Sequence, residues 1–172
     1  SNQVAGVDFQ YRNSNFRPGK RLEASVHAQR SFSDVRSDDD AFGVGVEYPN
    51  DPWKASLKAK QIGRDFRPAL GFVNRPGVRV YEGEVHWFRR PTDSLARLID
   101  VGGSELVVTD LDGRMESRND HVGVEIETSL NSKFTAGVDN AVEVIDAPFL
   151  LADSVLVPTG RYEFARAYAS YQ

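Results

Sequence analysis

The sequence contains no cysteine among its 172 residues. This absence excludes disulfide scaffolds, cysteine-ligated zinc and thiol catalysis together. The chain also lacks a run of about 18 apolar residues, which excludes a membrane-spanning helix but not a membrane-spanning β-strand, because such a strand alternates apolar and polar residues. There is no excess of positive charge either, since the net charge is −4. A broad nucleic-acid-binding surface is therefore not expected.

The start of the chain lacks an initiator Met and a signal peptide, and Ser1-Asn2 looks like a protease-cleavage scar left from a tag. We therefore expect residues 1–172 to be one β-barrel-like domain, excised from the C-terminal part of a larger protein. The missing signal gives no information about the compartment.

Apolar and polar residues alternate with a period of two almost throughout the chain. In one segment, Trp53, Ala55 and Leu57 alternate with Lys54, Ser56 and Lys58. The same pattern recurs at 5–12, 21–29, 41–48, 81–87, 122–127, 133–139 and 162–171, and a less regular extended segment covers 95–109. No segment shows a helical stripe, and a strand is favoured over a short helix at 92–100. The pattern predicts an all-β fold: an antiparallel up-and-down meander of about eight to nine strands, forming a barrel or a strongly curved sheet.

The links between these segments alternate in length. Links 49–52, 90–94 and 131–132 are tight, and 13–19 is intermediate, whereas 33–40, 63–77, 109–120 and 146–160 are longer or more polar. Short turns at one end and long loops at the other are typical of bacterial outer-membrane barrels. A soluble sandwich has no reason to sort its loops in this way.

The two faces of the expected sheet differ in composition. The polar face has six candidate functional residues: Lys54, Lys58, Lys60, Glu82, Glu84 and His86. Oppositely charged residues on neighbouring strands pair across a sheet, so this face is either a solvated surface or a charged barrel lumen. The other face is rich in alanine and has aromatic residues near strand ends. Such a face favours lipid over a soluble core, because alanine packs a small interior poorly and interfacial aromatics form girdles.

Catalytic and metal-binding patterns are weak, and we expect no catalytic residue, metal or cofactor. The three histidines (His27, His86 and His121) all fall on polar strand faces, far apart in the sequence. Glu82 and Glu84 lie about 7 Å apart on one face, a separation found between glycosidase carboxylates, but strand alternation produces such pairs constantly. Asp38-Asp39-Asp40 and Asp110-x-Asp112-Gly113 suggest calcium, yet the second lacks the distal Glu of an EF-hand loop, and turn chemistry explains both.

The link 63–77 is long for a structureless connection, and it carries apolar side chains. We expect it to fold back and pack, either into the lumen or over the rim of the barrel. Three arginines in it, Arg64, Arg67 and Arg75, suit an acidic group or simply add solubility.

The segment from Tyr48 to Tyr81 resembles an uncharacterised bacterial family. The resemblance is carried by Tyr48-Pro49-Asn50-Asp51 and by a loop motif: Gly63, Asp65, Phe66, Pro68, Ala69, Leu70, Gly71, Phe72, Val73 and Arg75. Two weaker pieces are Thr109-Asp110-Leu111-Asp112-Gly113-Arg114 and the ending Val157-Pro158-x-Gly160-Arg161-Tyr162. Members of that family have a secretion signal, a domain similar to carbohydrate-binding family nine, and then a predicted outer-membrane β-barrel. The resemblance implies a bacterial outer-membrane location, with this chain in the C-terminal part of the barrel.

Three functions follow as hypotheses. The first is a non-enzymatic segment of an outer-membrane barrel, whose partners are outer-membrane lipid and, in the parent protein, a saccharide ligand that is bound or taken up. The second is a soluble up-and-down barrel that holds a small ligand. The third is a carbohydrate-active enzyme domain that uses Glu82 and Glu84. An isolated piece of a barrel must also cover its apolar face, by curling into a smaller closed barrel, by pairing its edges with another copy of itself, or by remaining in detergent.

Overall fold

The computed structural model describes residues 2–34, 37–68, 73, 75–151 and 154–172, and this part of the chain is built of strands and their connections. The strands are β1 (Asn2–Arg17), β2 (Lys20–Ser33), β3 (Asp39–Pro49), β4 (Trp53–Ile62), β5 (Val78–Arg89), β6 (Ala96–Asp110), β7 (Met115–Thr128), β8 (Lys133–Ile145), β9 (Phe149–Leu151), β10 (Val155–Val157) and β11 (Gly160–Tyr171). Within the described residues, no helix is long and apolar enough to cross a membrane.

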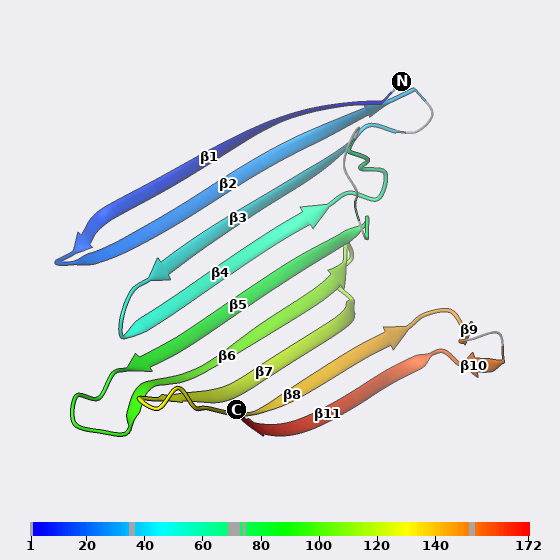
Figure 1. The fold of residues 1–172 in the computed structure, drawn as a ribbon. Coiled ribbons are helices and arrows are strands. Elements are labelled where there is room, and N and C mark those ends of the chain that lie inside the picture. The colour runs from blue at the N-terminus through cyan, green and yellow to red at the C-terminus, as the bar shows by residue number, and fades with distance from the viewer. Residues whose placement is uncertain (1, 35–36, 69–72, 74, 152–153) are drawn as a thin grey trace.

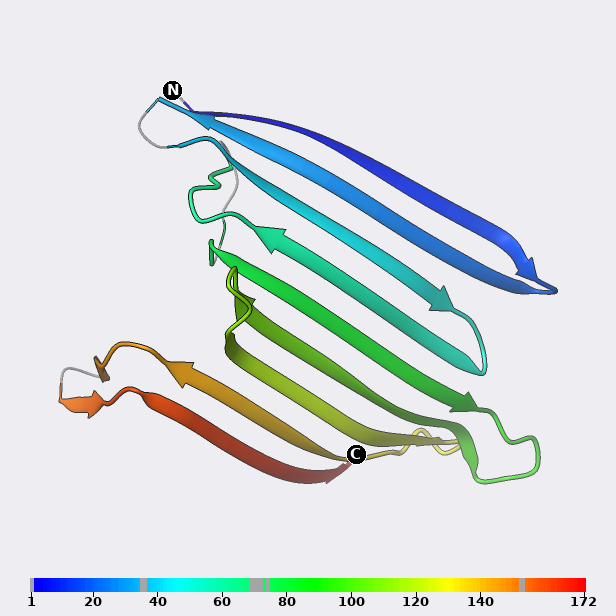
Figure 2. The same cartoon turned by 180° about the vertical axis from the view of Figure 1, so that it is seen from behind.

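Nine of the strands form one antiparallel meander in the order β1-β2-β3-β4-β5-β6-β7-β8-β11, as Figure 1 shows. The two short strands β9 and β10 pair separately, in the link that leads to β11. The all-β meander is thus confirmed. Of the two expected forms, the sheet takes the open, curved one and does not close into a barrel, because in the described part of the chain β1 and β11 each have a neighbour on one side only. The view from behind shows the same open sheet (Figure 2).

The connections gather at two ends of the sheet. We call the end with links 34–38, 63–77, 111–114 and 146–159 the loop end, and the end with links 18–19, 50–52, 90–95 and 129–132 the turn end. One expectation about the links is wrong: 109–120 is not a long loop. β6 runs to Asp110 and β7 starts at Met115, so only a tight turn joins them. The Asp110 carboxylate holds this turn by accepting the backbone N–H groups of Asp112 and Arg114, each at 2.8 Å.

The hairpin expected between 41–48 and 53–61 is confirmed, with Tyr48 opposite Ala55 and Ala41 opposite Ile62. Its turn is also tied to the preceding strand. The Asn50 side-chain oxygen accepts the backbone N–H of Arg21 at 2.8 Å, and its amide nitrogen donates to the Arg21 carbonyl at 2.7 Å. A side-chain amide that bonds both backbone groups of one residue extends the sheet ladder past its last strand pair.

Little of this single-layer sheet is buried. The few buried side chains lie on the polar side of the sheet and in the link after β4: Ser31, Ala41, Phe66, Val78 and Ser117. They mark the loop end, where the 63–77 link lies against the strands. Elsewhere both faces of the sheet are open, so any further covering must come from outside the described residues.

Candidate functional site: a charged face and an apolar belt

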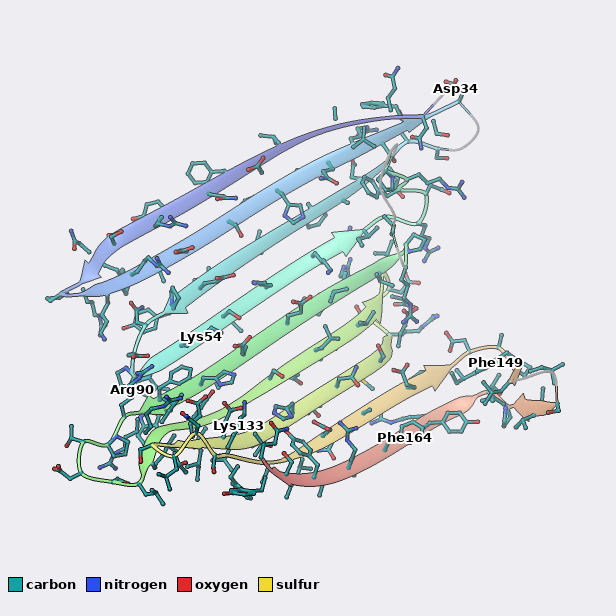
Figure 3. The ribbon with its side chains drawn as sticks, viewed as in Figure 1. Asp34, Lys54, Arg90, Lys133, Phe149 and Phe164 are labelled. Carbon is teal, nitrogen blue, oxygen red and sulfur yellow. The ribbon has the colours of Figure 1, made fainter. Side chains whose placement is uncertain are left out.

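Lysines and glutamates form a ladder on one face of β3, β4 and β5, which we call the charged face. Lys54 Nζ lies 3.0 Å from Glu84 Oε1, and Lys60 Nζ lies 3.6 Å from Glu82 Oε1. Lys58 Nζ turns the other way and lies 2.7 Å from Glu47 Oε1. Strand alternation fixes these side chains opposite Trp53, Ala55 and Leu57. The expected grouping of the lysines with Glu82 and Glu84 is thus confirmed. Figure 3 labels Lys54, the lysine at the start of β4.

His86 continues this ladder from β5 to β6. Its Nδ1 lies 2.8 Å from Asp100 Oδ1, and its Nε2 lies 3.4 Å from Glu84 Oε1. The ring lies over Gly102, its register partner, where an added Cβ would meet Nδ1 at 2.4 Å. Only glycine leaves room for the imidazole at that point. His86 is therefore one member of a row of contacting polar side chains that also contains Lys54 and Glu84.

A second cluster on the same face was not predicted. His121 Nδ1 lies 2.7 Å from Asp139 Oδ1, and Arg166 Nη2 lies 2.6 Å from Asp139 Oδ2. The ring of Tyr168 stacks on His121 with centroids 6.2 Å apart. These groups come from β7, β8 and β11. In the sequence, the only indication of the cluster is that its residues occupy the polar positions of the alternating pattern. Their partners depended on a register that the sequence does not state.

The motif loop packs onto the charged face at the loop end. Phe66 is only 4% exposed. The Arg67 N–H donates to Ser31 Oγ at 3.2 Å, and the Asp65 N–H donates to Asp39 Oδ2 at 2.8 Å. The Asp39 side chain lies so close to Gly63 that an added Cβ would meet its Oδ1 at 2.0 Å.

The far side of the same loop reaches the β6–β7 turn. Arg75 Nη2 lies 2.6 Å from Glu116 Oε2, and Arg64 Nη2 lies 3.5 Å from Asp112 Oδ2. Of the other motif residues, Pro68 is half-buried, and Gly71 and Phe72 lie outside the described residues. The described part of the loop therefore folds back and packs on the charged face at the loop end, as expected, whereas the open sheet has neither a lumen nor a rim on which to place it.

The opposite face, which we call the apolar face, is open. Val7 is 71% exposed, Phe9 64% and Leu57 71%. The sheet does not curl into a smaller barrel around this face, so that expected way of covering it is not seen. A soluble monomer tolerates an exposed apolar patch of only a few hundred Å².

The apolar residues form a belt that runs obliquely to the cross-strand rows. The row that starts at Tyr11 is apolar on its first strands and polar later, and it continues through Ala24, Val46, Leu57, Gly83, Glu105, Asp120, Asn140 and Ala165. The row that starts at Trp53 lies nearer the turn end and stays apolar through Trp87, Val101, Val124, Ala136 and Ala169. The belt therefore shifts toward the turn end from β1 to β8.

Aromatic residues follow the margin of this belt that faces the turn end: Tyr11, Tyr48, Trp53, Trp87, Phe134 and Tyr171. The row of Tyr11 crosses β4 at Leu57, and the row of Trp87 crosses β4 at Trp53. Between β1 and β5 the margin therefore shifts along the strands by the distance from Leu57 to Trp53. At about 3.3 Å per residue and about 4.8 Å per strand, this shift corresponds to an angle of about 35°.

Charged side chains limit the belt on its loop side. Arg118 bonds Glu105 Oε1 through Nη2 and Asp120 Oδ1 through Nε, at 2.9 Å each. All three side chains are on the apolar face by register. On β6 and β7 the belt therefore ends on the turn-end side of these three residues, whose charges pair with one another.

No group of three or more His, Cys, Asp or Glu side chains in the described ranges is placed to share a metal ion. No known protein family, curated protein or solved structure matches this chain. The resemblance to the bacterial barrel family therefore stays a prediction.

Proposed function

We propose that this sheet forms part of the wall of a β-barrel in a bacterial outer membrane, with the apolar belt against lipid and the charged face toward the interior. In this proposal the chain is a non-enzymatic, membrane-spanning segment.

The oblique belt is the observation that carries the proposal. Strands of a barrel tilt by about 35–45° from its axis, so a band of constant height crosses the hydrogen-bonded rows at that angle. The aromatic margin from Tyr11 to Trp87 crosses them at about 35°. Aromatic residues at the margin match the interfacial girdles of membrane barrels.

The charges support the same orientation. Among the described residues, the apolar face has charges only outside the belt, whereas the charged face has ion pairs along β4 and β5 from Lys54 to Lys60. Paired charges suit a water-filled interior, because neither partner has to be transferred into lipid. Glu82 and Glu84 each have a lysine partner and act in this proposal as structural charges.

The resemblance extends the proposal to the parent protein, which we propose binds or passes polysaccharide-related ligands. The ligand would then meet the charged face and the loop at 63–68, since these line the interior. The soluble-barrel alternative needs the apolar face inside a closed barrel, and nothing on the open sheet favours it.

Tryptophan fluorescence tests the orientation, because Trp53 and Trp87 are the two tryptophans of the chain and both lie on the apolar face. The protein is reconstituted into vesicles whose lipids are brominated on their acyl chains close to the headgroups, which is the depth of the belt margin. We expect strong quenching, since bromine quenches indole only on close contact.

The matched control moves the indole to the other face. In a triple variant, Trp53→Phe, Trp87→Phe and Ser56→Trp, the new ring projects from the charged face, where Ser56 lies opposite Glu84. We expect this variant to escape lipid quenching. Equal quenching of both proteins, or of neither, would contradict the proposed orientation.

A further inference from the structure

We infer that both open edges of this sheet are completed by a separate set of β-strands, odd in number, whose first and last strands run from the turn end to the loop end. A second copy of this chain does not meet that requirement. The inference rests on the proposed barrel wall, and it concerns what closes the wall.

The two edge strands lack three features that commonly protect a free edge, which are short length, proline and lysine. β1 has 16 residues and β11 has 12, and both are strands of the nine-stranded sheet with a neighbour on one side only. Neither contains proline or lysine. Free edges in proteins are usually short or interrupted by such residues, because unpaired N–H and C=O groups recruit other strands. These edges are therefore built to be paired.

The direction of the two edge strands decides whether the number of partner strands is odd or even. Every pair in the nine-stranded sheet is antiparallel, so β1 and β11 run in the same direction, from the loop end to the turn end. An antiparallel partner of either edge must run the opposite way. A set of strands that pairs with both edges, and alternates internally, then contains an odd number of strands. Together with nine it gives an even ring, as in bacterial single-chain barrels.

A second copy fails on direction. If two copies had the same orientation in a closed ring, β1 of each copy would lie beside β11 of the other. Both of these pairs would be parallel. Turned end for end, it would pair antiparallel but would place its loop end, with the 63–77 link, on the opposite side of the membrane. The pairing of edges between copies that the sequence suggests is therefore not the closure we infer.

The partner strands have a definite chemistry. They carry apolar residues on the belt side and polar residues on the interior side, in continuation of both faces. Asp8 projects from the charged face of β1 and has no ion-pair partner among the described residues. We expect a lysine or arginine opposite it, because opposite charges on facing strands stabilise a pair.

Fusions that add strands to the whole chain test whether the number of partner strands is odd. Residues 20–62 appended after Gln172 repeat β2, β3 and β4, which start at the turn end and finish at the loop end beside β1. Residues 20–49 repeat only two strands and leave the last one parallel to β1. Amide hydrogen exchange of β1 and β11 is measured for both fusions in detergent micelles.

We expect the three-strand fusion to slow the exchange of edge amides by about 100-fold or more relative to the unfused chain, and the two-strand fusion to leave at least the β1 edge fast. Edge exchange that is equal in the two fusions overturns the inference. So does the efficient formation of covalent dimers by the unfused chain, with Val7→Cys and Ala167→Cys joined by a bis-maleimide in vesicles. The chain has no other cysteine. The micelle assay contains no bilayer, so its outcome is independent of the lipid quenching that tests the proposed function.

Discussion

Trp53 and Trp87 lie directly opposite each other on β4 and β5, with both rings on the apolar face. The row that joins them lies nearer the turn end than the row of Tyr11, which crosses the same two strands at Leu57 and Gly83. The two tryptophans thus lie on the oblique margin of the belt, which is nearer the turn end at β4 and β5 than at β1. An indole pair at such a margin places two amphipathic rings at the level of the lipid headgroups.

A charge placed in the middle of the belt should destabilise the inserted sheet. Leu57→Arg puts a guanidinium on the apolar face, and we expect a loss of about 2–4 kcal/mol in the free energy of unfolding from vesicles. The matched variant Ser56→Arg changes the neighbouring residue on the other face, between Glu47 and Glu84. We expect that variant to unfold like the unchanged protein in urea titrations followed by tryptophan emission. Equal losses from both variants would mean that the two faces meet the same environment.

Removal of the Phe66 ring should release the motif loop from the charged face. Phe66 is the most buried side chain among the described residues of that loop, and Phe→Ala at such a site costs about 3–5 kcal/mol. We expect Phe66→Ala to make residues 63–68 sensitive to limited proteolysis while the strands remain protected. Arg67→Ala serves as the control, because the Arg67 side chain is exposed and its backbone N–H keeps the bond to Ser31. A loop that stays protected in Phe66→Ala would show that the backbone bonds alone hold it.

The sequence predicts the strands and their faces because alternation is a local property. The placement of the lysines on one face with Glu82 and Glu84 follows from it, because β4 and β5 are neighbouring antiparallel strands. The particular Lys54–Glu84 pair needs the register of these two strands. The His86–Asp100 and His121–Asp139 contacts do not follow, because each needs the register of a further pair of strands. The sequence predicts a loop where β7 begins because the belt is oblique, which places the polar residues Arg118 and Asp120 on the face that is apolar elsewhere.

Acidification should open the turn between β6 and β7. Hydrogen bonds from the backbone N–H groups of Arg114 and Asp112 hold the pKa of the Asp110 carboxyl below its ordinary value. A lowered native pKa stabilises the turn above the ordinary pKa of about 3.9. That stabilisation is lost as the pH falls through the native pKa. We expect the protection of the Arg114 amide, corrected for its intrinsic exchange rate, to fall over this interval.

Asp110→Asn is the control for this titration, because its side-chain oxygen still accepts the same N–H groups but has no proton to gain. Its protection should stay level across the interval. Parallel losses in Asp110→Asn and in the unchanged protein would assign the effect to other carboxyl groups.

The Lys54–Glu84 pair should contribute modestly to stability. Its side chains are 49% and 36% exposed, and such pairs are worth about 0.2–1 kcal/mol. A double-mutant cycle of Lys54→Gln and Glu84→Gln, measured by urea unfolding, should give a coupling energy in this range that decreases with added salt. A coupling that is insensitive to salt would place this pair away from water.

The oblique belt is tested most directly by the depths of two residues in one cross-strand row. Leu57 on β4 and Asn140 on β8 both belong to the row of Tyr11. Each is replaced by a spin-labelled cysteine in the otherwise cysteine-free chain, and collisions with oxygen and with a water-soluble nickel chelate are measured in vesicles. The account predicts that the label at position 57 collides mainly with oxygen, deep in the lipid, and the label at position 140 mainly with nickel, near the surface. Equal depths for the two labels would contradict a belt tilted across the strands.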